Sequence, residues 1–329
     1  MKKIAILGLG RIGQIHLKNL LDHRAQVQPI AITSSQIGRD YAQSLGVEMT
    51  FNTLGEALQQ ESLDGLVICS PSDTHFEYTK QLIEQHIPVF CEKPLDLSIS
   101  RIEVLEKLAA NRKVPLMVAF NRRFDPQFAA LKKAIEDGQV GIPHVLKITS
   151  RDPGLPPMEF IEHSGGLFMD MVIHDFDMAR FLMQEEVVEV YTKASIKIDP
   201  ELATYNDFDT AHTILTFESG GVAIIDNSRQ AKYGYDQRIE VFGSEGMLQV
   251  GNQYPIAVQS YNELGSHHPK PFTFFIDRYQ ASYREELKEF VQIVLGEQQV
   301  TLGAVDAKAA TQIAIAAMAS VSKNQPIRL

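Results

Sequence analysis

The sequence predicts an α/β domain with a parallel sheet, followed by an α+β domain with a large, mostly antiparallel open sheet. Short apolar runs alternate with helical patterns up to about residue 120, whereas later strands follow strands directly. The length of 329 residues also suits two domains better than one. We place the boundary so that the domains span residues 1–121 and 122–329.

Composition narrows the class of protein. With 44% apolar and 22% charged residues, the chain is typical of a soluble globular protein. A net charge of −10 argues against nucleic acid or an anionic membrane as the main partner. The first apolar run is cut by Arg11 too early for a signal peptide, and no stretch is long enough to span a bilayer. Two cysteines, Cys69 and Cys91, outside any CxxC motif favour the reducing cytoplasm.

The first expected strand, residues 4–7, is followed at once by Gly8-Leu9-Gly10-Arg11-Ile12-Gly13 and a helical pattern. Gly8 permits a tight turn, Gly10 lets the backbone approach a pyrophosphate, and Gly13 allows close packing of helix on strand. The helix N-terminus then presents N–H groups to the phosphates. In this context the motif predicts a dinucleotide-binding domain of the Rossmann type. A purely structural glycine-rich turn is the alternative.

The rest of the first domain alternates in the same way. Strands are expected at residues 27–32, 47–51, 63–69, 88–91 and 115–120. Helices are expected at residues 36–45, 53–60, 73–86 and 98–111. Asp73 is the expected N-cap of the third of these helices. Apolar strands in such an alternation predict a parallel sheet covered on both faces, and such sheets bind ligands at the carboxyl ends of their strands.

The end of the second strand departs from the usual NAD-binding pattern. An acid for the ribose hydroxyls normally follows the glycines by about 20 residues, but here Thr33, Ser34 and Ser35 occupy the place, with Arg39 close behind. Hydroxyls and an arginine would suit the 2′-phosphate of NADP. Alternatively, the hydroxyls bind the ribose of NAD and Arg39 is a solvated helix residue.

Two further strand ends carry polar residues. The loop Cys69-Ser70-Pro71 leads to His75, which could contact ribose or phosphate, or simply face solvent or cap a helix. Glu92-Lys93-Pro94 follows the fifth strand. Pro94 disfavours helix at Lys93, so this lysine is expected on the rim, where it could polarise a hydroxyl. A rim lysine that is merely solvated is the alternative.

In the second half, Gly165-Gly166 precedes a helix expected over residues 170–182. Asp170 and His174 stand four residues apart and would share one face of that helix. A carboxylate beside an imidazole is a common proton-handling pair, because it can orient the ring. A surface contact or a packed core histidine is the alternative.

The second domain begins with an expected N-cap at Asp125, with Pro126 at the first helical position. The helix should run to about Glu136. Strands are expected at residues 145–150, 187–198, 209–217, 222–228, 238–242 and 247–250. Closing helices are expected at residues 279–295 and 304–322.

Together, the glycine motif, the loop at residues 69–75, Glu92-Lys93-Pro94 and the later glycine pair with Asp170 and His174 resemble the Gfo/Idh/MocA family of NAD(P)-dependent oxidoreductases. The resemblance spans essentially the whole chain. The branch that acts on inositol is suggested by residues 120–125, 150–154, 173–182 and 233–240. NAD is the expected cofactor. Because residues 33–35 lack the acid of NAD-using members, NADP remains open.

The resemblance implies oxidation of one ring hydroxyl of a cyclic polyol, with myo-inositol giving 2-keto-myo-inositol. It assigns His174 as base, Lys93 as the charge beside the same oxygen, and Asp170 as a holder of substrate hydroxyls, in a site closed between two domains. Asp175 should face away and Asp177 should be structural. Further candidates for the ring hydroxyls are Arg123, which could instead form an ordinary salt bridge, Asp152 and Tyr233. The expected cofactor contacts are Gly8, Gly10, Arg11, Ile12, Gly13, Thr33, Ser34, Arg39, Cys69, Ser70, Pro71, His75, Glu92 and Lys93.

The expected partner is a small polyol, with no metal, nucleic acid or membrane, and the family further implies a homotetramer. Three other functions are weighed. One is a different polyol or sugar dehydrogenase, of scyllo-inositol or glucose type. Another is a metal-dependent enzyme using Asp170, His174 and His163 as ligands, which would leave the glycine motif and Lys93 unexplained. The third is a nucleotide sensor, which has no need of a base.

Overall fold

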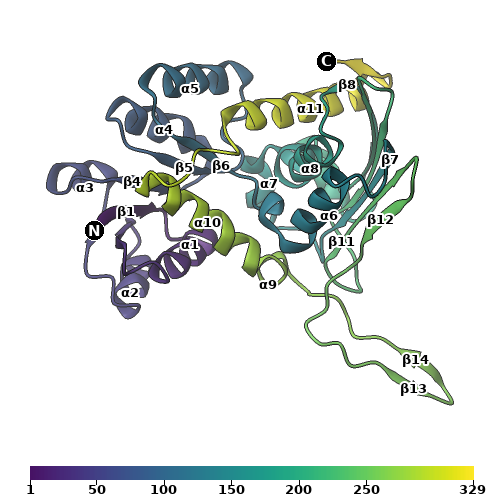
Figure 1. Ribbon diagram of the computed structural model, residues 1–329, viewed down its shortest axis with the longest axis horizontal. Coiled ribbons are helices and arrows are strands. Elements are labelled where there is room, and N and C mark those ends of the chain that lie inside the picture. Colours follow the sequence, from purple (N-terminus) through teal and green to yellow (C-terminus); the bar gives the residue numbers. More distant parts are fainter. The chain divides into compact units, whose positions relative to one another are not determined.

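The computed structural model describes residues 1–329 and divides into two compact units (Figure 1). The first comprises Met1–Phe124 and Ala281–Ala309, and the second comprises Asp125–Gln280 and Ala310–Leu329. Residues 281–309 thus return to the first unit, whereas the sequence-based boundary places them in the second domain. The cause is the apolar face of α10 (Gln280–Leu295), which is buried in the same core as β1 and α1.

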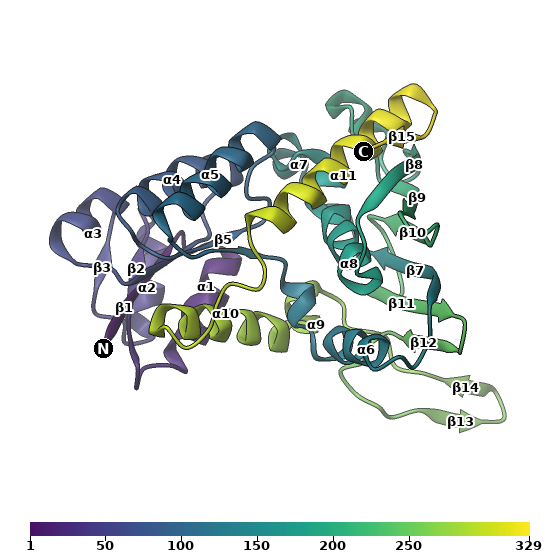
Figure 2. The same cartoon turned by 45° about the horizontal axis from the view of Figure 1, so that its top comes forward.

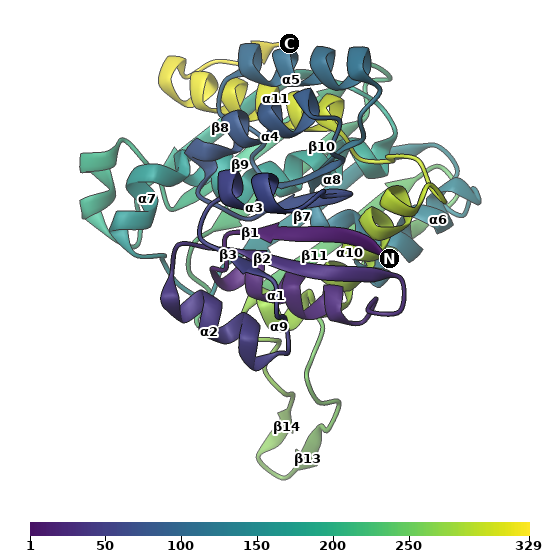
Figure 3. The ribbon, with the colours of Figure 1, turned by 90° about the vertical axis from the view of Figure 1, so that its left-hand side faces the viewer.

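The first unit contains a parallel sheet in the order β3-β2-β1-β4-β5-β6, which confirms the predicted doubly covered architecture. Its strands are β1 (Lys2–Leu7), β2 (Val27–Ile32), β3 (Thr50–Phe51), β4 (Gly65–Ile68), β5 (Val89–Glu92) and β6 (Leu116–Ala119). Its helices are α1 (Arg11–Leu21), α2 (Gln36–Ser44), α3 (Leu54–Gln60), α4 (His75–Glu84) and α5 (Ile99–Arg112). Helices α1 and α2 lie on one face of the sheet, and α4 and α5 lie on the other (Figure 2 and Figure 3).

The expected N-cap at Asp73 is wrong. A 3₁₀ turn, η1 (Ser72–Thr74), precedes α4, because the Thr74 amide donates to the carbonyl of Pro71 instead of starting an α-helical turn. Helix α4 therefore begins two residues later than expected, at His75.

The second unit contains a seven-stranded sheet in the order β12-β11-β7-β10-β9-β8-β15. All neighbours are antiparallel except β7 and β10, as the sequence predicted for a mostly antiparallel sheet. The strands are β7 (Pro143–Arg151), β8 (Val187–Ser195), β9 (Thr210–Phe217), β10 (Val222–Ser228), β11 (Asp236–Gly243), β12 (Met247–Val250) and β15 (Ile327–Arg328). Helices α6 (Pro126–Glu136) and α8 (Ile173–Met183) lie on one face of this sheet (Figure 2). Another long helix is α11 (Ala304–Lys323).

The helix α6 begins as predicted: the Asp125 carboxylate accepts hydrogen bonds from the amides of Gln127 (3.1 Å) and Phe128 (3.2 Å), and Pro126 opens the helix. The helix expected over residues 170–182 is modified at its start. A π-helical turn, η3 (Phe168–Val172), precedes α8, so Asp170 lies on a wider turn than the pattern implied.

Several short elements were not predicted. They are η2 (Asn121–Phe124), α7 (Met158–Ser164), η4 (Pro200–Tyr205), β13 (Ser260–Asn262), β14 (Gly265–His267), α9 (Phe275–Arg278) and the edge strand β15. The β13–β14 hairpin projects away from the rest of the second unit (Figure 1). None of the helices is both long enough and apolar enough to cross a bilayer.

Candidate active site

The glycine turn between β1 and α1 leaves the backbone accessible where a dinucleotide would approach. A Cβ on Gly8, which has φ of +89°, would lie 2.8 Å from the main chain at the end of β4. A Cβ on Gly13 would lie 1.8 Å from the carbonyl oxygen of Gly8. No atom lies within 4 Å of the Cβ position of Gly10, the N-cap of α1. The empty space beside Gly10 is suited to a pyrophosphate at the N-terminus of α1, where Arg11 and Ile12 form the first turn.

At the end of β2, hydroxyl groups and one cation stand where a carboxylate is usual. The Thr33 hydroxyl accepts from the amide of Ser35 at 3.3 Å, and Ser35 caps α2. The Arg39 guanidinium donates to the Thr33 carbonyl at 2.9 Å and to Gln36 Oε1 at 2.7 Å. Arg39 is therefore held over the strand end, and Ser34 beside it is exposed.

The loop after β4 is tied to the Glu92-Lys93-Pro94 turn through His75. This histidine is 1% exposed, with Nδ1 2.8 Å from the Pro94 carbonyl oxygen and Nε2 2.9 Å from that of Ser70. Burial by itself would lower the pKa of His75, but Cys91 and the two carbonyl groups outweigh it and raise the pKa to about 9. Because both ring nitrogens are engaged, His75 serves the cofactor loop by holding Ser70 and Pro94 in place.

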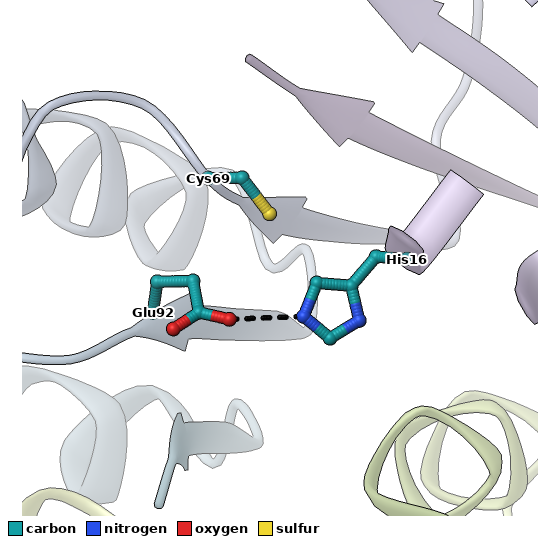
Figure 4. A group of neighbouring side chains, drawn as sticks. All are labelled: His16, Cys69 and Glu92. Atoms are coloured by element: carbon teal, nitrogen blue, oxygen red, sulfur yellow. Dashed lines mark hydrogen bonds and ion pairs between the residues drawn. The ribbon is translucent and has the colours of Figure 1, made fainter. Parts of the chain in front are cut away.

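The end of β5 at Glu92 is held by a histidine that was not predicted from the sequence. His16 on α1 is fully buried, and its Nε2 lies 2.9 Å from Glu92 Oε1 (Figure 4). The same nitrogen lies 3.9 Å from Glu286 Oε1. Burial and the Glu92 charge raise the pKa of Glu286 well above its usual value. Burial and Glu92 likewise raise the pKa of the neighbouring Cys69 thiol. The spacing of His16 three residues after Gly13 is the signal that could have placed it on the sheet-facing side of α1.

Lys93 follows directly at the carboxyl end of β5 and is half-buried, as expected of a rim residue. Its peptide bond to Pro94 is cis.

In the second unit, Asp170 is held by a buried arginine. Arg229 directly follows β10 and is 1% exposed, and its Nη1 lies 3.2 Å from Asp170 Oδ2. Its Nη2 lies 3.9 Å from Asp207 Oδ2. A guanidinium taken out of water needs such acidic partners. Arg229 is the second residue that was not predicted from the sequence. The only feature that could have indicated it is an arginine at the end of a strand with alternating apolar residues.

The glycine pair before the Asp170–His174 segment is required by close packing. Gly166 has φ of +76°, and a Cβ there would lie 2.7 Å from Asp207 Oδ1. The same oxygen accepts a hydrogen bond from the Leu167 amide at 2.8 Å. Asp207 thereby fixes the chain just before the π-helical turn, and Gly165 also has a left-handed φ of +80°.

His174 lies in the first turn of α8 and is half-buried. Its neighbour Asp175 is fully buried and accepts a hydrogen bond from Asn227 Nδ2 of β10 at 2.7 Å. Asp177 is also fully buried. These two carboxylates are directed into the protein, whereas His174 keeps part of its surface accessible.

The three further polar candidates lie in different surroundings. Arg123 Nη2 forms an ion pair with Asp306 Oδ1 at 2.9 Å, the ordinary salt bridge that the sequence left open. The Tyr233 hydroxyl donates to the Asp236 carboxylate. Asp152 follows β7, and its amide donates to the main chain of the β10 end at 2.9 Å. The structure therefore gives protein partners to Arg123 and Tyr233.

Known proteins resemble the chain over its full length. Residues 2–120 match the model of an oxidoreductase family with an NAD-binding Rossmann fold, and residues 128–249 match the GFO/IDH/MocA C-terminal domain. The chain is 41% identical to a myo-inositol 2-dehydrogenase of Thermotoga maritima, over 99% of this chain and 98% of that protein. It is 39% identical to an inositol 2-dehydrogenase of Rhizobium meliloti, over 99% of each. A crystal structure of scyllo-inositol dehydrogenase from Lactobacillus casei with bound NAD(H) and scyllo-inositol superimposes with a TM-score of 0.91 at 28% identity, covering 100% of this chain and 99% of that one.

The raised pKa of His75 predicts a pH-dependent stability. A pKa of about 9 in the folded protein, against 6.5 for the ordinary group, corresponds to about 3 kcal/mol of stabilisation. This stabilisation should be complete below about pH 6.5 and disappear as the pH rises through about 9. Thermal unfolding of wild type and His75→Gln should therefore differ most at about pH 6 and converge at about pH 9.5. The exposed His86→Gln serves as the control, and a gap for His75→Gln that is independent of pH would contradict the prediction.

Proposed function

The chain belongs to the Gfo/Idh/MocA family of oxidoreductases, and on that premise we propose that it oxidises myo-inositol to 2-keto-myo-inositol. The observation that carries the proposal is the ion pair by which the buried Arg229 holds Asp170, four residues before His174. The chain is also 41% identical to a myo-inositol 2-dehydrogenase. NAD is the cofactor of this fold. We place the reaction in inositol catabolism in the cytoplasm, a reducing compartment that suits two unbridged cysteines.

The second candidate substrate is scyllo-inositol, because the Lactobacillus casei structure contains that isomer together with NAD(H). The same residues would act on either isomer. A panel of inositols and sugars, with nicotinamide absorbance as the readout, separates these substrates from each other and from glucose. Absence of hydride transfer across the whole panel would favour the nucleotide-sensing alternative.

In the proposed mechanism, His174 accepts the proton of the reacting hydroxyl. NAD, when bound, would supply the hydride acceptor for the carbon that carries this hydroxyl. An imidazole suits this task because its ordinary pKa lies close to neutral pH. The ammonium of Lys93 stabilises the negative charge that develops on the oxygen. Asp170 accepts a hydrogen bond from a neighbouring hydroxyl, in an orientation set by Arg229.

The other ring hydroxyls need further directional partners. We propose Asp152, Arg123 and Tyr233 for them. Arg123 and Tyr233 would each bind a substrate hydroxyl and keep their present partners, Asp306 and Asp236. Since each keeps a protein partner, their loss should affect substrate affinity more than the chemical step.

The catalytic assignment is tested by His174→Asn and Lys93→Met. Each should lower kcat with NAD and myo-inositol by about 10²-fold or more, because each removes a group that acts on the reacting oxygen. Cofactor binding, followed by the quenching or shift of NADH fluorescence, should stay within about threefold for His174→Asn. The matched controls are His86→Asn, in the exposed turn after α4, and Lys133→Met, on the exposed last turn of α6. Near wild-type turnover of His174→Asn at saturating substrate would disprove the assignment of His174 as the base.

We further propose that NADP is also accepted, through Arg39. The guanidinium lies at the end of β2 on the Thr33 carbonyl and meets no carboxylate within ion-pair distance there. A 2′-phosphate would gain a charge-assisted hydrogen bond from it, worth about 1.5–3 kcal/mol.

Arg39→Ala should therefore lower kcat/KM for NADP by about tenfold or more, and that for NAD by less than about threefold. Steady-state kinetics with both nucleotides measures the ratio. Equal losses for NAD and NADP would show that Arg39 only maintains the strand end. Arg24→Ala, which removes an arginine elsewhere in the first unit, is the control.

We also propose a homotetramer assembled through the uncovered face of the seven-stranded sheet. Apolar side chains of neighbouring strands are exposed there, and Ile214 pairs directly with Ile224 across β9 and β10. These two are 42% and 43% exposed, and Phe242 and Met247 are each 50% exposed. An apolar area of this kind on a sheet is typical of a protein–protein interface.

Light scattering after size exclusion should give a mass of four chains of 36.8 kDa for the wild type. Ile224→Lys combined with Phe242→Glu should dissociate the assembly, because each places a charge in an apolar contact. Val104→Glu, at an exposed apolar position of α5, should not. A wild-type mass of one chain would disprove the tetramer.

A further inference from the structure

A compact cluster of metal-binding side chains lies under the strand ends of the first unit. A ring nitrogen of His16, Cys69 Sγ and a Glu92 carboxylate oxygen all lie within 4.8 Å of one another. The three come from α1, the end of β4 and the end of β5, and they point toward one another (Figure 4). Edge-on ring contacts with Phe90 and Tyr283, at centroid distances of 5.2 and 5.9 Å, hold the imidazole in this direction.

A fourth group faces the same place and has no hydrogen-bond partner. Glu286 on α10 is fully buried, and neither of its carboxylate oxygens forms a hydrogen bond. Its Oε1 lies 3.9 Å from His16 Nε2. Buried polar atoms are nearly always paired, because leaving them unpaired costs free energy. An unpaired acceptor of this kind beside an imidazole is what a bound cation would satisfy.

We propose that His16, Cys69, Glu92 and Glu286 form a Zn²⁺ site. One imidazole nitrogen, one sulfur and two carboxylate oxygens are all ligand types that zinc binds, and four of them suit its tetrahedral coordination. Bond lengths of about 2.0–2.3 Å place tetrahedral ligand atoms about 3.3–3.8 Å apart. The ligand atoms of His16, Cys69 and Glu92 must therefore close by up to about 1 Å, and Glu286 must turn its carboxylate toward them. Binding replaces the His16–Glu92 hydrogen bond with two metal bonds, and the Cys69 thiol and the Glu286 carboxyl group each release a proton to solvent.

The site would connect metal binding to the cofactor loop. His16 follows Gly13 by three residues, Cys69 directly precedes Ser70, and Glu92 directly precedes Lys93. Zinc would draw these segments together and shift Lys93 from the position that hydride transfer needs. The structure therefore points to reversible inhibition by Zn²⁺, a consequence that rests on the proposed dehydrogenase function, whereas metal binding itself does not.

Cobalt binding tests the site without turnover. Titration of the full-length, cofactor-free protein with Co²⁺ should give one equivalent with a thiolate-to-cobalt charge-transfer band. Only two cysteines can produce this band, since the chain contains only Cys69 and Cys91. The band should disappear in Cys69→Ser and persist in Cys91→Ala. His16→Gln and Glu286→Gln should each weaken Co²⁺ affinity by about tenfold or more.

Three results would overturn the site: no thiolate band in the wild type, a band that follows Cys91, or an affinity unchanged in both His16→Gln and Glu286→Gln. Circular dichroism checks the fold of each variant, and the two glutamine variants carry the test if Cys69→Ser does not fold. Competition of Zn²⁺ with Co²⁺ then gives the zinc affinity, and loss of the band on adding Zn²⁺ is expected.

Inhibition is measured separately, with NAD and myo-inositol. Zn²⁺ should inhibit the wild type and a chelator should restore its rate, while Glu286→Gln, compared with its own chelated rate, should need about tenfold more Zn²⁺. Cobalt binding without zinc inhibition would keep the site and reject the link to Lys93. An enzyme inactive on inositol that still gives the cobalt band would reject the proposed substrate and keep the site.

Discussion

Close packing of α1 against the ends of β1 and β4 is the constraint on which the first unit depends. A side chain at Gly8 or Gly13 would overlap the main chain, so the helix can approach the sheet only with glycine at both positions. The same approach buries His16 and brings it to Glu92. The helix that follows the glycine turn therefore also fixes the strand end that carries Lys93. Cofactor loop and rim lysine are parts of one packed structure.

In the second unit, the pairing of buried charges fixes the position of Asp170, as close packing fixes the strand end in the first unit. Arg229 lies between Asp170 and Asp207, and Asp207 in turn holds the Leu167 amide and leaves no room for a side chain at Gly166. Removing one member would leave a buried charge without its partner, which costs several kcal/mol, about 3–5 in measured cases. The position of Asp170 is thus set by this network, because the π-helical turn around it interrupts the regular helical hydrogen bonds.

Local periodicity explains how far the sequence could predict the molecule. Alternating apolar runs and the glycine motif were sufficient for the parallel sheet, and consecutive strands were sufficient for the second sheet. A π-helical turn adds one residue to a helix without changing its polar pattern, so the start of α8 was not foreseen. Short elements such as α7 and β13 have too few residues for a period. The amphipathic pattern of α10 shows that one face is buried but not that it packs on β1.

Local motifs in the sequence led to candidate site residues, whereas the partners that hold two of the site's carboxylates lie far away in the chain. Lys93, Asp170 and His174 belong to recognisable local patterns in the sequence. His16 and Glu92 are separated by 76 positions, and Arg229 and Asp170 by 59. Such partners meet only in the folded chain, and a histidine inside an amphipathic helix has the same appearance in the sequence whether or not it finds a carboxylate.

Stability alone gives no reason for the buried His16–Glu286 pair. Apolar side chains of similar size at these two positions would avoid the desolvation of a carboxyl group and an imidazole, and such replacements are often neutral or stabilising. The surroundings would accept them, since Leu287, Phe290 and Phe90 already form the core there. Asp207 differs, because its carboxylate binds a main-chain amide that would otherwise be unpaired. A polar group kept in a core without such a structural task is best explained by what it holds, and the groups within reach of Glu286 are the histidine on the cofactor helix and, through it, the glutamate beside Lys93.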